Sequence, residues 1–529
     1  MMGECVRKVT EPAGRHVIVV AYSVIATMRI DYLLTLLLLL AASQPSGLRG
    51  QGTEATPVED DRPKILRTLR DTSPATATAT KTTPLADSVT IVDVFMEGHK
   101  RTRDRVIVRE MGLKRGARVP SADLRERVDL SYNTLMNTGL FASVEIAIDT
   151  LSADEVALVL QIRETWYLYP VPVFGLADRN FNVWFNENNA SLDRVDIGAK
   201  LTYYNFTGRR DKFKIGFTTG YTREYEFSYN HPYVNAAGTL GLGLSYSFRR
   251  RREQNYLTVD NQQKFYSEED NFVFRRTNVD LSLRYRKELF VTHRIELGYR
   301  NTSIADTIAR SLNPDFFGGA RNSQQFGRLA YFYSTDKRDV RNYPWAGYLI
   351  SGSVEKEGLG ITGERSGLTL GGTYAKFLPL SDKYSLNFGM AAKYSLIRTQ
   401  QPFLENRAIG FGSNGLVGYQ FYVVDGLDML IWRAGIRREI FRAKLDLGKY
   451  AFIDAFRYVP IRLLFAVQFN QGFSNSPFVG EANPLTNRLL TGMSAGLDAV
   501  LYYDMVGSIQ YNRNHLGEDG VFIALQLSF

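Results

Sequence analysis

The chain ends with Val521-Phe522-Ile523-Ala524-Leu525-Gln526-Leu527-Ser528-Phe529, and this stretch decides the fold. Its odd-numbered residues are all apolar and its even-numbered ones are mixed, which is the period of a β-strand with one apolar face. Such a strand either closes a membrane barrel or forms a buried edge in a soluble sheet. The terminal Phe529 favours the membrane strand.

The composition of the 529 residues agrees with strands in a membrane. Aromatic residues reach 12%, the mean hydropathy is -0.20, and no run of about 18 apolar residues follows the N-terminal region, which excludes a helical membrane protein. Because unpaired backbone groups are costly in hydrocarbon, spanning strands must close into a barrel. The net charge of +9 suits anionic headgroups or a charged lumen, or is simply solvated. Cys5 is the single cysteine, which excludes a disulfide framework and a thiolate metal site.

Residues 1–50 predict a signal-peptide region, because the apolar core Leu33–Ala42 follows Arg29 and precedes small and polar residues. The stretch before this core is long, so we expect translation to begin at Met28. Residues 51–87 are rich in Thr, Ala, Pro and Asp and predict a disordered linker.

Residues 88–164 predict a small β-α-α-β-β domain. Val89–Glu97 is the expected first strand, Thr102 the expected cap of a short helix, and Ser121 the start of a second helix. That helix should bury one face made of Leu124, Val128, Tyr132 and Leu135. Alternating apolar residues within 144–162 then predict two strands.

Residues 165–529 predict an all-β transmembrane barrel of about 16 antiparallel strands. Apolar and polar residues alternate through 195–203, and again through 279–285 and 386–394. A soluble sandwich would also alternate, but the even spacing, the aromatics near strand ends and the signal peptide favour the barrel. The expected strand starts are Trp166, Leu192, Lys212, Tyr225, Leu240, Phe272, Leu289, Arg328, Trp345, Glu364, Tyr384, Asp428, Pro460, Arg488, Tyr503 and Gly520.

Pro170 and Pro172 lie two residues apart in the first expected barrel strand, so their missing N–H groups belong to one edge. If this edge faces the last strand, with Leu525, Leu527 and Phe529, the seam between them is weak, as a lateral gate requires. The alternative is that both prolines precede the strand.

The predicted small domain, residues 88–164, and the predicted barrel, residues 165–529, both resemble the Omp85 superfamily. The segments similar to its POTRA module are Gly98–Thr102, Val106–Arg109, Gly116 and the turn Thr138-Gly139-Leu140-Phe141. Those similar to its surface-antigen (D15, BamA-like) barrel are Asn205–Phe213, Tyr229–Tyr233, Phe411–Tyr419, Asn483–Asp498 and Asn512–Phe529.

The resemblance implies a bacterial outer-membrane protein whose periplasmic POTRA-like domain binds unfolded polypeptide clients by strand addition, and which inserts or translocates them without ATP. Outer-membrane lipids and accessory periplasmic or lipoprotein subunits are the other expected partners, and nucleic acid is not expected. The alternatives are a rigid spacer role for the domain, a dedicated secretion transporter, and a passive pore.

The resemblance also implies a long loop whose Arg-Gly-aromatic motif contacts an acidic residue on the inner wall. The longest interruption, Arg398–Leu427, is glycine-rich and expected to be functional or inserted into the lumen. Its matching segment is Leu416-Val417-Gly418-Tyr419, with Val417 in place of Arg. The matching wall segment is Gln468–Gly472, in which Asn470 stands in place of the family's Asp and Gly472 is the final glycine. Strand alternation points Asn470 into the lumen. Replacing both the Arg and the Asp avoids an unpaired buried charge. Because the ion pair between loop and wall is then missing, we expect the loop to be held less firmly or by other contacts.

We expect no catalytic site and no cofactor. Gly492-Met493-Ser494-Ala495-Gly496 matches a hydrolase elbow, but it lies in an alternating strand, so an enzyme would require Ser494 to act outside the strand-turn-helix context. The five histidines lack metal-ligand spacing. The Arg249–Arg252 run is expected to face water or headgroups.

Overall fold

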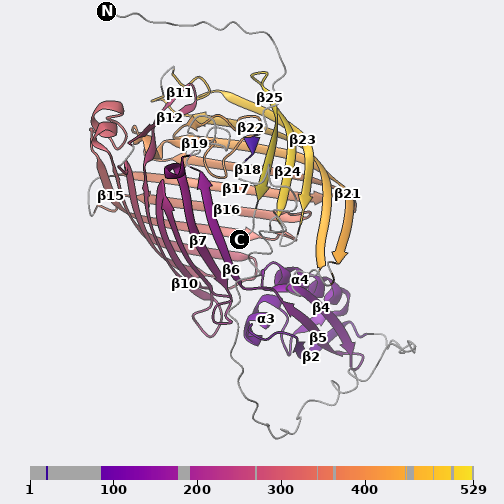
Figure 1. Cartoon of the computed structure of the whole chain (residues 1–529). Helices are drawn as coiled ribbons and strands as arrows, with labels where there is room; N and C mark the ends of the chain where they lie inside the picture. Colours follow the sequence, from indigo (N-terminus) through magenta and orange to yellow (C-terminus); the bar gives the residue numbers. More distant parts are fainter. Residues whose placement is uncertain are drawn as a thin grey trace, which may run out of the picture.

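The computed structural model describes residues 20–21, 85–176, 191–268, 271–341, 343–360, 365–446, 448, 458–479, 482–501 and 505–526. Figure 1 shows a curved wall of long strands with a small α+β domain beside one end of it. The signal-peptide and linker predictions, including the start at Met28, fall mainly outside the described residues.

The N-terminal domain is a four-stranded sheet with two helices. Its elements are β2 (Ser88–Glu97), α3 (Asp104–Met111), β3 (Arg118–Pro120), the 3-10 turn η1 (Ser121–Asp123), α4 (Leu124–Met136), β4 (Phe141–Thr150) and β5 (Glu155–Glu164). The strand order is β3-β2-β5-β4, and β2 and β5 are parallel. The predicted order of elements lacks only β3, which has three residues and one buried side chain, Val119, and is too short to show a period.

The helices bury Ile107 and Met111 of α3 and Leu124, Val128 and Leu135 of α4 in the core of this domain. The prediction that Tyr132 shares this face is wrong, because its side chain is 43% exposed. Ser131 is buried in its place, and its hydroxyl donates to the Met111 carbonyl at 2.8 Å. Positions 131 and 132 both border the apolar stripe of the helix. Ser131 takes the buried position because its side chain is small and its hydroxyl has the Met111 carbonyl as acceptor.

Sixteen antiparallel strands follow among the described residues. They are β6 (Leu168–Leu176), β7 (Val195–Tyr204), β8 (Lys212–Gly220), β9 (Thr222–His231), β10 (Leu240–Arg251), β13 (Phe274–Tyr285), β14 (Val291–Ile304), β15 (Ser323–Asp336), β16 (Gly347–Glu357), β17 (Gly367–Pro379), β18 (Tyr384–Ser395), β21 (Asp428–Asp446), β22 (Tyr458–Asn475), β23 (Leu489–Val500), β24 (Val506–Asn514) and β25 (Asp519–Gln526). The predicted fold class is confirmed. Each predicted start lies within five residues of the observed one, because apolar and polar residues alternate along these strands.

Shorter elements lie in the connections. They are η2 (Leu192–Arg194), the hairpin β11 (Glu253–Val259) and β12 (Gln262–Ser267), the π-helix η3 (Ile308–Leu312), η4 (Phe403–Glu405), and the pair β19 (Arg407–Ile409) and β20 (Val424–Asp425). Within the described residues, no helix has the length and apolar character needed to cross a membrane.

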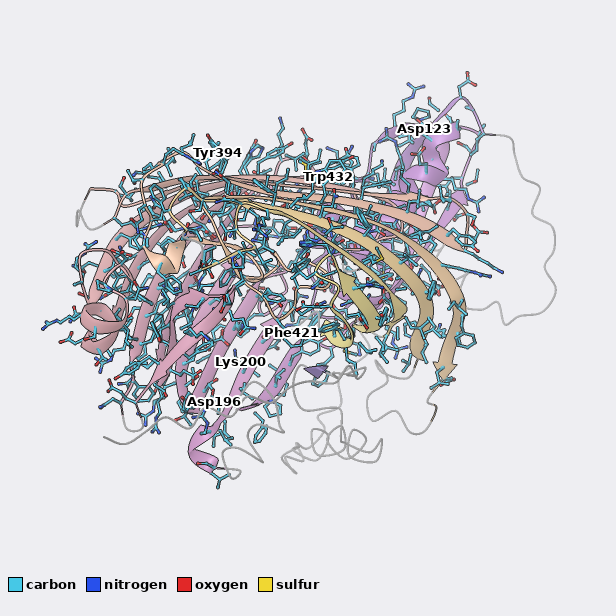
Figure 2. All side chains as sticks on the ribbon, turned by 90° about the horizontal axis from the view of Figure 1, so that it is seen from above. Asp123, Asp196, Lys200, Tyr394, Phe421 and Trp432 are labelled. Carbon is cyan, nitrogen blue, oxygen red and sulfur yellow. The ribbon has the colours of Figure 1, made fainter. Side chains whose placement is uncertain are left out.

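The outer surface of the barrel is apolar. Leu242, Leu244 and Tyr246 alternate along β10 and are 54%, 41% and 41% exposed, and Leu281 and Leu283 lie beside them on β13. Figure 2 shows Tyr394 and Trp432 on the same convex surface. So large an apolar surface is unfavourable in water, and it is the surface that a membrane barrel presents to lipid.

The first and last barrel strands, β6 and β25, are neighbours in the sheet order. Registers join every consecutive pair from β6 to β25, for example β6 to β7 and β24 to β25. At this junction β25 also pairs in parallel with β1 (Val20–Ala21). We call this place the seam.

Candidate functional site

The long loop between β18 and β21 folds against the inner wall of the barrel. Its buried apolar residues form one cluster with residues of the wall and of the connection before β23: Ala391, Ala408, Ile409, Leu416, Tyr419, Val424, Met429, Ile431, Leu485 and Leu490. Figure 2 shows Phe421 of this loop inside the curve of the sheet, beside the yellow C-terminal strands. The loop therefore lies in the lumen. A cavity of about 810 Å³ separates it from the wall of β14–β18.

Glycines of the wall form the surface on which the predicted motif Leu416–Tyr419 lies. A methyl group on Gly472 would lie 3.2 Å from a side-chain carbon of Leu416, and one on Gly492 would clash with the Val417 carbonyl oxygen. Asn514 of β24 donates to the Gly418 carbonyl at 2.8 Å. Gly418 itself has a φ of +81°, which favours glycine. The structure thus brings the loop motif and the wall position Gly472 together.

Asn470, the other predicted wall residue, is 3% exposed and lies in register between Arg433 of β21 and Gly492 of β23. Its Oδ1 has no hydrogen-bond partner among the described residues. Arg433 reaches the loop instead, because its Nη2 donates to the carbonyls of Ser413 (3.2 Å) and Gly415 (3.0 Å). Lys393 of β18 also donates to loop carbonyls, those of Arg407 (2.7 Å) and Gly426 (3.2 Å). These cations that hold the loop belong to the wall, whereas the resemblance implied a cation on the loop.

Aromatic residues of the loop bind the last hairpin. The Tyr419 hydroxyl donates to the Thr491 carbonyl at 3.2 Å and also contacts Nδ1 of His515. The Tyr422 hydroxyl donates to Glu518 at 2.6 Å, in the turn before β25. Phe421 packs on Phe522 of β25 with ring centroids 5.7 Å apart. The loop therefore contacts the strand that borders the seam.

Both predicted seam prolines lie inside β6, opposite Leu201 and Ala199 of β7. The backbone N–H of Tyr204 donates to Tyr167 at 2.8 Å, so these two residues are a hydrogen-bonded pair. Since such pairs alternate in an antiparallel ladder, Tyr169, Val171 and Val173 direct their N–H groups to β7. Pro170 and Pro172 stand at the alternate positions. Their missing donors therefore belong to the seam edge of β6.

On the other side of the seam, Leu525 pairs with Gly507 of β24. Leu527 and Phe529 lie outside the described residues.

The N-terminal domain docks on the barrel through the segment Gly98–Thr102. The Glu164 carboxylate accepts backbone N–H groups of Lys100, Arg101 and Thr102 at 3.1, 3.1 and 2.7 Å. Burial raises the pKa of Glu164, but these hydrogen bonds outweigh burial and lower it.

The Thr102 hydroxyl takes part in the same junction, where it accepts from Asn205 Nδ2 of the β7–β8 turn at 2.8 Å. The prediction that Thr102 caps the first helix is wrong. Arg103 is the N-cap residue, without a side-chain hydrogen bond, because Thr102 is already bound to the charged Glu164 and to Asn205.

Glu110 of α3 is the electrostatic centre of this docking and is 1% exposed. Its carboxylate accepts from Arg210 at 2.6 Å and from Arg286 at 2.6 and 3.0 Å, and Tyr233 also contacts it. These partners come from three barrel turns. Burial raises the pKa of Glu110, but Arg210 and Arg286 outweigh burial and lower it to about 2.

The predicted turn Gly139-Leu140-Phe141 belongs to the core of the N-terminal domain. Gly139 has a φ of +70°, and Leu140 and Phe141 are 2% and 4% exposed. The Leu140 carbonyl accepts from the Tyr167 hydroxyl at 3.0 Å, just before β6. The turn therefore supports the junction, and it lies apart from the lumenal loop.

Sequence reasoning missed Glu110, Arg286 and Arg433. One signal was present for Glu110, because it lies on the helical face that also carries Ile107 and Met111, where a carboxylate must find a partner. Nothing local marked the two arginines. Among the described residues, no group of three or more His, Cys, Asp and Glu side chains is arranged to hold a metal ion.

Two family models match this chain. Residues 205–424 match the Omp85 superfamily domain, and residues 89–165 match the surface antigen variable number repeat, POTRA. Fold and matches together define an outer-membrane β-barrel with one POTRA domain. The chain carries an Omp85 superfamily domain and a POTRA domain.

The chain is also similar to three solved structures. BamA from Haemophilus ducreyi lacking POTRA domains 1–3 has 15% identity and a TM-score of 0.46, over 82% of each chain. CdiB from Acinetobacter baumannii has 13% identity and a TM-score of 0.45, over 83% of this chain and 73% of its own. CdiB from Escherichia coli has 11% identity and a TM-score of 0.45, over 87% and 94%. A comparison with curated proteins gave no match.

Proposed function

We propose that this protein inserts polypeptides into the outer membrane, or translocates them across it, by opening the seam between β6 and β25 without ATP. The observation that carries the proposal is the placement of Pro170 and Pro172, which removes two donors from the seam edge. An edge that lacks these two donors pairs weakly with β25 and opens at low cost. A client strand can then pair with β25 during passage.

The POTRA domain is the proposed receiving surface, on the periplasmic side. Among the described residues β4 pairs only with β5, so its other edge, Phe141–Thr150, offers unpaired backbone groups over ten residues. A client in extended conformation can add to this edge. The contacts of Glu110 with Arg210 and Arg286, and of Thr102 with Asn205, hold the domain at the barrel end where β6 begins.

A disulfide lock across the seam tests the proposal. Cysteines replace Val171 or Val173 in β6 and Phe522 or Ala524 in β25, all facing the lumen, after the native cysteine is changed to serine. The matched control joins Ser508 and Ala524, which are already paired in the β24–β25 ladder. We expect the seam lock, and not the control, to stop insertion of an unfolded reporter barrel into proteoliposomes. Unchanged insertion by the locked protein would refute the proposal, and ion conductance without any insertion would identify a passive pore.

A further inference from the structure

Three arginines form a cross-strand row on the outer face of β9, β10 and β13. Arg250 lies in register with Arg223 on one side and with Arg275 on the other. We call these three residues the arginine row. They follow the same alternation as Tyr246 and Leu244, so they share the lipid-facing surface. The row stands at the barrel end away from the POTRA domain, because the turns that dock the domain join the opposite ends of these strands.

The charges of this row are unbalanced. Arg249, the neighbour of Arg250 on the inner face, donates to Glu224 at 3.0 Å. In the part of the chain that the structure describes, no carboxylate pairs with the arginine row, and Nε of Arg223 and of Arg250 is buried without a hydrogen-bond partner. Like charges directly opposite each other destabilise a sheet. An anion between them would remove this repulsion and satisfy the buried donors.

An aromatic side chain fixes the guanidinium groups. Phe272 has the guanidinium carbons of Arg223 and Arg250 at 5.0 and 4.8 Å from its ring centroid. One step nearer the barrel middle, Tyr225 and Phe248 pair across the same strands with centroids 6.2 Å apart. Aromatic residues of a membrane barrel gather where hydrocarbon meets headgroups. The arginine row therefore lies at the level of the headgroups.

We infer that the arginine row binds the phosphate groups of an anionic lipid in the outer leaflet. Guanidinium groups match phosphate oxygens in bidentate geometry, and three of them side by side suit a lipid with more than one phosphate. A lipid is favoured over a soluble anion because the row continues the lipid-facing surface. This inference rests on the position of the barrel in the membrane, and it is independent of polypeptide handling.

Native mass spectrometry of the full chain tests it, with diphosphorylated lipid A as the probe. The fraction of R223Q/R250Q/R275Q that carries this lipid should be lower than that of the wild type by about tenfold or more. The control R249Q/E224Q removes a neighbouring pair of charges on the inner face and should retain it normally. Folding of each variant is checked by heat-modifiable gel migration, and R223K/R250K/R275K, which keeps the charge, should retain an intermediate amount.

Three results would overturn the inference. The first is equal retention by the glutamine variant and the control. The second is equal retention of the dephosphorylated lipid by the wild type. The third is complete displacement of the lipid by inorganic phosphate, which would identify a site for a soluble anion. Loss of lipid binding with normal insertion of the reporter barrel would leave the proposed function intact.

Discussion

The substitution Glu110→Gln removes the charge at the centre of the POTRA docking while preserving its shape. The fall in the pKa of Glu110 from 4.5 to about 2 corresponds to about 3 kcal/mol of stabilisation at neutral pH. Breaking a buried ion pair by removing one partner costs about 3–5 kcal/mol, because here Arg210 and Arg286 are left buried without a carboxylate. We therefore expect E110Q to weaken docking by about 3 kcal/mol, and the barrel to remain folded.

The assay is hydrogen exchange of α3 and of the turn at Arg286, in the full chain at neutral pH. The control E126Q changes an exposed carboxylate on α4 and should exchange like the wild type. Equal protection in E110Q and E126Q would show that the charge of Glu110 does not hold the POTRA domain on the barrel.

The same group predicts a pH dependence. Because the pKa of folded Glu110 is depressed, its stabilisation is fully present above 4.5 and is lost as the pH falls from 4.5 toward 2. In the wild type, protection of α3 should decline across this window. In E110Q the decline over the same window should be smaller.

Two further predictions concern the lumenal loop and the seam. Gly492→Ala places a methyl group against the Val417 carbonyl, so residues 416–419 should leave the wall and lose hydrogen-exchange protection. In the control Gly507→Ala the added methyl group meets nothing within 4 Å, so the loop should keep its protection. Protection retained in G492A would contradict the contact of the loop with the wall. Replacing Pro170 and Pro172 by Val returns two donors to the seam edge, worth about 1 kcal/mol each, and should slow reporter insertion about thirtyfold. The control Pro379→Val in β17 should not slow insertion. Equal rates in the seam variant and the wild type would show that the prolines do not set the strength of the seam.

The barrel could be predicted because a membrane strand carries its own signal. The alternation of 195–203 and of the closing strand states which face meets lipid, and strand starts such as Lys212, Leu240, Tyr384 and Asp428 agree with the structure. Strands without a visible period were missed: β3 has only three residues, and β11 and β12 do not alternate apolar with polar residues. The wall contact of Leu416 was expected from resemblance alone, since no local pattern joins residues about 56 positions apart.

The docking site could not be predicted, because its energy lies in contacts between distant segments. Glu110 and Arg286 are 176 residues apart. The position of Glu110 on the apolar face of its helix indicates that it needs a partner, but nothing near it in the sequence identifies Arg286 as that partner. Thr102 illustrates the same limit, because local pattern assigned it to a helix cap while Glu164 and Asn205 hold it at the junction. The resemblance implied an arginine on the loop, whereas Arg433 of the wall donates to loop carbonyls in this structure. Resemblance to a motif does not reveal such a change of side.

The proposed function requires the seam to open, and a reversible lock is the most direct test of this opening. In a single sample of the protein locked between β6 and β25, the rate of reporter insertion is recorded before and after reduction of the disulfide. We expect no insertion above the lipid background in the oxidised state and full recovery on reduction. An equal rate in both states would contradict it.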